Sequence, residues 1–164
     1  RSRGLAQALE AHLSALPLAQ DPGAKAIGVK ISGCPNSCGQ HHIADIGFYG
    51  SSRKVGEREV PHYVLLLGGR TREGEARFGQ VVGRIPARRV PEAVERILKR
   101  YLEERQNGES FQAYLDRVGA ASFKPLLQDL QEVPPYEEAP EFYQDLGAEG
   151  EAFSVQLGRG ECAV

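Results

Sequence analysis

Gly33-Cys34-Pro35-Asn36-Ser37-Cys38-Gly39 is the stretch around which the fold of this chain is organised. A strand-like run precedes it at 26–31, and a second follows it at 43–49. The two thiols are separated by three residues in a turn rich in glycine, proline and asparagine, so both can point into one small volume. Thiolates bind iron and zinc far better than oxygen ligands do. The stretch therefore predicts half of a site for a soft metal at the end of a strand.

The composition is that of a globular domain long enough to bury a core. The chain has 164 residues, of which 41% are hydrophobic and 26% charged. The net charge of −2 gives no reason to expect nucleic acid as a partner. No apolar run approaches the roughly 20 residues that a membrane span needs. The chain contains no methionine and opens with Arg1-Ser2-Arg3-Gly4, so we expect it to be processed or cut from something longer.

The cysteine count leaves the metal site incomplete. The chain has three cysteines, and Cys162 lies far from Cys34 and Cys38 in sequence. Two ligands are too few for a closed four-ligand site. Either Cys162 and a histidine complete it, or the missing ligands lie outside this chain. Neighbours in sequence point in different directions, so at most one of His41 and His42 joins the cysteines easily, and a polar lining role is favoured for them.

The remaining pattern predicts an α/β (α+β) fold in the broad sense, a small mixed sheet flanked by helices. The continuous apolar run at 64–67 indicates a strand covered on both faces. Aromatic residues at helical spacing after Pro91 are interpreted as core. Strands are expected at 26–31, 43–49, 62–67 and 78–85, the last three as an antiparallel meander, and helices at 5–16, from Pro91 to before Asn107, around 111–118 and around 123–130.

The composition changes from Val133 onward. An acidic, proline-rich segment at 133–140 is typical of a linker, and a strand is expected at 152–157 in the tail that follows. The predicted boundaries are a domain at 1–132 and a linker with tail at 133–164. Cys162 is interpreted as a free thiol near the terminus.

The stretch from Ser32 to Gln40, followed by Ile43 to Gly50, closely resembles the second cluster motif of the sirohaem-dependent nitrite and sulfite reductases. His62-Tyr63 with Leu67-Gly68-Gly69 resembles the strand that follows this motif in the family. Segments between 90 and 119 resemble its terminal helices. The resemblance covers about residues 1–120, and the fold it implies is that of the family's 4Fe–4S domain.

The resemblance implies a set of roles. Four cysteines hold a 4Fe–4S cluster in this family, so Cys34 would be a cluster ligand. Cys38 would be both a cluster ligand and the axial bridge to the sirohaem iron. Asn36 would tune the cofactors from beside them. The enzyme would reduce a small anion by six electrons, nitrite to ammonia or sulfite to sulfide, and the form of the cysteine motif favours nitrite.

The resemblance also implies what this stretch lacks. The first cysteine pair and the anion-binding Arg and Lys residues would belong to a missing N-terminal portion of the same enzyme. This C-terminal portion would hold no catalytic residue of its own, and alone it would be inactive and lack both cofactors. The donor would be a protein such as ferredoxin, and the location cytoplasmic. Two alternatives remain open: a zinc module built on Cys34, Cys38 and one or two of His41, His42 and Cys162, and a non-catalytic interaction module.

Overall fold

A four-stranded sheet forms the centre of the molecule. The computed structural model of the chain describes residues 2–72 and 74–155. In the sheet order β1-β2-β3-β6, β1 is parallel to β2, and the other neighbours are antiparallel. The strands are β1 Val29–Ser32, β2 Ile46–Val55, β3 Arg58–Leu67 and β6 Gln80–Pro86. The expected antiparallel meander is confirmed as β2-β3-β6.

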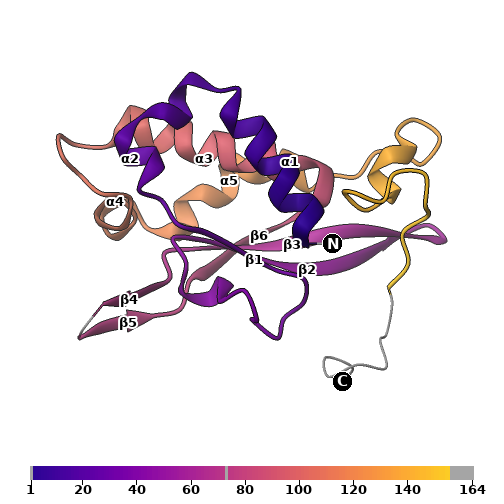
Figure 1. The fold of residues 1–164 in the computed structure, drawn as a ribbon, viewed down its shortest axis with the longest axis horizontal. Coiled ribbons are helices and arrows are strands. Elements are labelled where there is room, and N and C mark those ends of the chain that lie inside the picture. Colours follow the sequence, from indigo (N-terminus) through magenta and orange to yellow (C-terminus); the bar gives the residue numbers. More distant parts are fainter. Residues whose placement is uncertain (1, 73, 156–164) are drawn as a thin grey trace.

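Helices cover one face of this sheet (Figure 1). The first two lie ahead of β1, and the other three follow β6. The α-helices are α1 Ser2–Ser14, α2 Pro22–Lys25, α3 Val90–Glu104, α4 Phe111–Val118 and α5 Lys124–Leu127. The expected fold class, a small mixed sheet flanked by helices, is confirmed. No helix among the described residues is long and apolar enough to cross a membrane.

The core lies between the sheet and these helices. Side chains of Phe48 and Leu65, which are paired across β2 and β3, are fully buried. They belong to one apolar cluster with Ile97 and Tyr101 of α3. The aromatic side chains expected in the core pack ring to ring, with centroids 5.4 Å apart for Tyr101 and Tyr114. Burying such side chains supplies most of the driving force for this fold.

Two expected elements differ from the structure. The polar segment at 51–59 continues β2 and β3 as a long hairpin, because the two strands hydrogen-bond to each other beyond the apolar core. The expected helix around 123–130 is broken into α5 between two 3-10 turns, at 120–123 and 129–131. Pro125 lies in the first turn of α5, where its missing N–H costs no hydrogen bond, so it fixes where α5 begins.

The segment after Val133 packs against the domain. Leu146 is 6% exposed and belongs to the same core cluster as the sheet and helices. The Tyr143 hydroxyl donates to the Pro134 carbonyl at 2.9 Å, which closes the segment into a loop. Figure 1 shows this orange to yellow segment beside the tip of the β2–β3 hairpin. Of the expected strand at 152–157, residues 152–155 form none, and the rest, like Cys162, lies outside the described residues.

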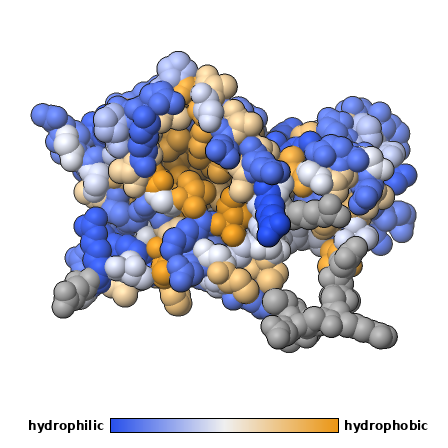
Figure 2. All heavy atoms as spheres, in the orientation of Figure 1, coloured by the Kyte–Doolittle hydropathy of each residue, from blue (hydrophilic) through white to orange (hydrophobic). Residues whose placement is uncertain are grey.

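One edge of the sheet is open. Among the described residues β1 pairs only with β2, so its other edge has no strand beside it. The apolar side chains of Ile27, Val29 and Ile31 are only partly buried there. Figure 2 shows hydrophobic atoms gathered in a hollow between α2 and the sheet. An apolar hollow beside an unpaired strand is a surface suited to covering by another segment.

Candidate metal-thiolate site

The two cysteines lie in the turn that joins β1 to the 3-10 helix η2 (His41–Ile43). Figure 1 shows this purple segment on the side of the sheet away from α1 and α3. Both thiols are free; Cys34 is half-buried and Cys38 is exposed. Two uncrosslinked thiols in one surface turn are available to a ligand that approaches from outside the domain.

A buried serine at the end of β1 ties the two ends of the turn together. The Ser32 hydroxyl accepts a hydrogen bond from the Gly39 backbone N–H at 3.0 Å. The same hydroxyl is hydrogen-bonded to Nδ1 of His41 at 2.7 Å. Ser32 is 3% exposed and His41 is fully buried. The bond to His41 is buried and the bond to Gly39 is partly buried, and together they fix the start and the end of the turn relative to each other.

Two residues of the turn adopt left-handed backbone conformations. Ser37 has φ 60° and Gln40 has φ 57°, which is unusual for residues other than glycine. The Ser37 hydroxyl is hydrogen-bonded to Nδ1 of His42 at 3.0 Å, and Lys30 Nζ donates to Gln40 Oε1 at 2.8 Å. Side-chain bonds from outside the turn therefore hold both of its strained residues.

Glycines let the turn lie directly on the sheet. A Cβ placed on Gly47 of β2 would come within 2.0 Å of the His41 carbonyl oxygen. A Cβ on Gly50 would come within 2.2 Å of the Gly33 carbonyl oxygen. Backbone can approach backbone this closely only where no side chain stands between them. Gly47 and Gly50 thus allow the backbone at both ends of the turn to pack directly against β2.

The adjacent histidines, His41 and His42, pack against each other and against β2. Their rings lie 4.0 Å apart between centroids, and the His41 ring also lies 4.8 Å from that of Tyr49. Burial lowers the pKa of His41, and the charge of His42 lowers it further. His41 therefore stays neutral near pH 7, and its Nε2 is buried without a hydrogen-bond partner.

The described residues, which exclude Cys162, do not assemble the zinc site that the sequence left open. Among the described residues, no group of three or more His, Cys, Asp or Glu side chains could hold a metal ion. Nδ1 of His41 and of His42 is taken by a serine instead. Asn36 is exposed, and its side chain makes no hydrogen bond within the described part of the chain. The described residues thus provide two free thiols and a hydrogen-bonded support for the turn that carries them.

Sequence reasoning missed a second anchor beside the turn. The Asp45 carboxylate accepts a bond from the Gly28 N–H at 2.7 Å and another from the Gln112 side-chain amide. The same Gln112 amide nitrogen donates to the Gly69 carbonyl at 2.9 Å. These bonds join the starts of β1 and β2 to α4. The only sequence signal is the Asp within Ala44-Asp45-Ile46-Gly47, whose partner is 67 residues away.

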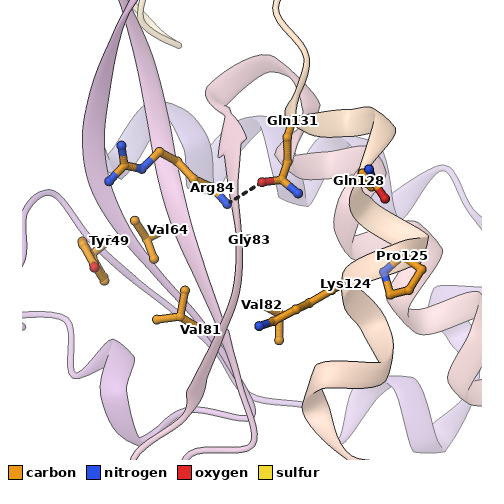
Figure 3. A pocket seen from close by; sticks show the side chains of 10 residues that line it. All are labelled: Tyr49, Val64, Val81, Val82, Gly83, Arg84, Lys124, Pro125, Gln128 and Gln131. Atoms are coloured by element: carbon orange, nitrogen blue, oxygen red, sulfur yellow. Dashed lines mark hydrogen bonds between the residues drawn. The ribbon is translucent and has the colours of Figure 1, made fainter.

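A groove of about 630 Å³ opens near the turn (Figure 3). Its floor includes Tyr49 and Val64, and α5 forms one wall. Lys124 extends into the groove, and Arg84 extends away toward Tyr49. Neither cation has a carboxylate partner among the described residues. Tyr49 connects this groove to the histidine pair.

The fold is a mixed sheet with helices on one face, and its cysteine turn presents two free thiols of the kind that bind soft metals. Comparison with known proteins identifies the family. Residues 2–133 match the family described as the nitrite and sulphite reductase 4Fe-4S domain. This chain belongs to that family, and the resemblance of the cysteine motif to these enzymes is confirmed.

Curated relatives and a solved structure agree with this assignment. A sulfite reductase [ferredoxin] 1 from Mycolicibacterium paratuberculosis is 33% identical over 95 residues, which are 56% of this chain and 17% of that protein. The sulfite reductase [NADPH] hemoprotein beta-component from Dickeya chrysanthemi is 31% identical over 101 residues, 62% of this chain and 16% of that protein. The structure of the Mycobacterium tuberculosis NirA protein matches with a TM-score of 0.58 and 29% identity, over 71% of this chain and 21% of that one.

The relatives are much longer than this chain. It spans 17% and 16% of the two curated proteins named above. The chain is therefore similar to one part of an oxidoreductase whose family uses an iron–sulfur cluster.

Proposed function

We propose that this chain is the part of a nitrite or sulfite reductase that supplies Cys34 and Cys38 to a 4Fe–4S cluster, with Cys38 also bridging to the sirohaem iron. The single observation that carries the proposal is the rigid turn with two free thiols, in a chain that belongs to this family. Asn36, exposed in the same turn, is two residues from each cysteine in sequence and would lie beside the bound cofactors.

The donor set fits half of such a cluster. Thiolates are the ligands that 4Fe–4S clusters require, and four are needed. The chain has three cysteines in all, so it cannot fill the set alone. The remaining ligands, and the groups that bind the substrate anion, would come from the rest of the same enzyme. The apolar hollow beside the open edge of β1 supports this, because it offers that remainder a surface to cover.

When bound, the two cofactors would supply the redox centres for the six-electron reduction of nitrite to ammonia or of sulfite to sulfide. The residues of this chain would hold the cluster and fix its orientation through the braced turn. The cysteine motif favours nitrite, whereas the curated relatives named above are sulfite reductases. We propose a protein donor such as ferredoxin, after the name of one relative. A reducing compartment such as the cytoplasm would keep both thiols free.

Iron and acid-labile sulfide analysis tests the proposal directly. Expressed together with the rest of the enzyme, the chain should contribute to a product with about four irons and four sulfides per cluster and a strong visible sirohaem spectrum. Cys34→Ser and Cys38→Ser should each remove the cluster, whereas Cys162→Ser should leave it in place. Expressed alone, the chain should hold iron far below one cluster per chain.

Two results would contradict these expectations. A stoichiometric cluster on the chain alone would refute the view that it holds only half of the ligands. A colourless complete enzyme, with zinc in place of iron, would refute the proposed function altogether and favour the zinc module.

A further inference from the structure

We propose that His41 and His42 are positioning residues of the cysteine turn. Each imidazole holds one serine of the turn through Nδ1, at 2.7 Å to Ser32 and at 3.0 Å to Ser37. The two bonds set the spacing of the thiols before any metal is bound. The inference rests on the proposed function only in treating those thiols as ligands.

The His41 brace acts on the end of the turn. Its partner, the Ser32 hydroxyl, also accepts the N–H of Gly39, the residue after Cys38. The imidazole is fully buried, and among the described residues its Nε2 has no hydrogen-bond partner, so Nδ1 is the atom through which the ring is hydrogen-bonded. A buried histidine bonded in this way is suited to hold the Ser32 hydroxyl in place.

The His42 brace acts on the middle of the turn. Ser37 directly precedes Cys38 and has φ 60°, a conformation that a non-glycine residue holds only when its surroundings impose it. The hydrogen bond to His42 is the contact that the Ser37 side chain makes. His42 is itself held between the ring of His41, at 4.0 Å, and that of Phe78, at 5.3 Å. The brace is therefore preformed rather than recruited by a ligand.

Cadmium titration tests this inference without iron. Cd²⁺ binds paired thiolates and reports them by ultraviolet charge-transfer absorption. All proteins carry Cys162→Ser, so that the signal comes from Cys34 and Cys38. We expect His42→Ala and Ser37→Ala each to weaken Cd²⁺ binding about five- to tenfold, the equivalent of one hydrogen bond. The double variant should be no weaker than either single one, because both remove the same bond.

Matched variants separate positioning from general loss of structure. His42→Asn should bind Cd²⁺ as the parent does, because the asparagine amide can replace Nδ1. His41→Asn and Ser32→Ala extend the test to the buried brace, with thermal melts to verify folding. His12→Ala serves as the histidine control, since its ring is bonded to Glu95 on α3 at 2.6 Å instead.

The Cd²⁺ affinities of the variants decide whether the histidines position the turn. Parent-like Cd²⁺ affinity in both His42→Ala and Ser37→Ala would overturn the inference, as would a parent protein that gives no thiolate signal. Weakened binding with rescue by His42→Asn would support it. That result, combined with a complete enzyme that holds no iron, would leave the braces in place and refute only the proposed function.

Discussion

Gly47→Ala is the substitution that most directly tests how the cysteine turn is supported. The added Cβ would lie 2.0 Å from the His41 carbonyl oxygen and 2.9 Å from the carbonyl carbon. Ordinary van der Waals contact would require His41 to move by at least about 1.4 Å. The obstacle is backbone, so no side-chain rotation can relieve it. Moving His41 would in turn stretch its bond to Ser32, which is now 2.7 Å long.

The expected cost is large for a single methyl group. Overpacking a well-packed site usually costs about 1–3 kcal/mol, and a clash with backbone belongs at the upper end of that range. For a chain of this size, each kcal/mol lowers the melting temperature by about 2–4 °C. Gly47→Ala should therefore melt about 5–10 °C below the parent. It should also bind Cd²⁺ more weakly at Cys34 and Cys38, although Gly47 contacts neither thiol.

Gly33→Ala is the matched control. It places the same methyl group in the turn itself, where the nearest atom is the Ser2 hydroxyl oxygen at 3.9 Å. We expect its free energy of unfolding to stay within about 0.5 kcal/mol of the parent value. Thermal melts by circular dichroism measure both variants. If Gly47→Ala and Gly33→Ala melted at the same temperature, the backbone contact between η2 and β2 would not support the turn.

Other perturbations address other parts of the molecule. Burial, together with the nearby arginine charges, lowers the pKa of His62. The free energy of unfolding should therefore fall as the pH drops below about 6.5, because the unfolded state then binds a proton that the folded state does not. Thermal melts at several pH values should show a weaker pH dependence for His62→Asn. Asp116 accepts bonds from Arg70 at 2.9 Å and Arg77 at 2.6 Å, so Asp116→Ala should speed amide exchange in the β4–β5 hairpin (Arg70–Arg72 and Glu75–Arg77) and leave β3 protected. Leu146→Ala should cost about 2–4 kcal/mol in urea unfolding, whereas a tail without core contacts would make it neutral.

Much of the fold could be predicted because side-chain pattern and backbone agree in it. Helix α3 begins beside Pro91 and has an apolar stripe, and the run at 64–67 is buried on both faces as expected. The prediction failed where the side-chain pattern does not determine the structure. The β2–β3 hairpin extends through polar residues because its ladder needs no apolar side chains, and Leu146 reaches the core from a segment whose composition is typical of a linker.

The candidate site could be predicted only in part, for the same physical reason. Its donors are visible as two cysteines in a turn. Its supports are not, because Ser32, Ser37 and the histidines bond to one another across five to nine residues with no periodic pattern. The sequence favoured a polar lining role for the adjacent histidines, but it gave no sign that their Nδ1 atoms would hold the two serine hydroxyl groups.

The cysteine motif depends for its conformation on residues that lie outside it. The seven residues from Gly33 to Gly39 contain the thiols, yet the side-chain hydrogen bonds that fix their backbone come from Ser32 and η2, and the glycines of β2 let the turn pack closely against that strand. A peptide of the motif alone would therefore keep its ligands and lose the strained conformation at Ser37. The smallest unit that can specify the thiol geometry is the whole β1-turn-η2-β2 segment, held at its base by Asp45. Substitutions at the supporting residues outside 33–39, such as Ser32 and His42, should therefore weaken metal binding as strongly as the substitution of Ser37 inside the motif.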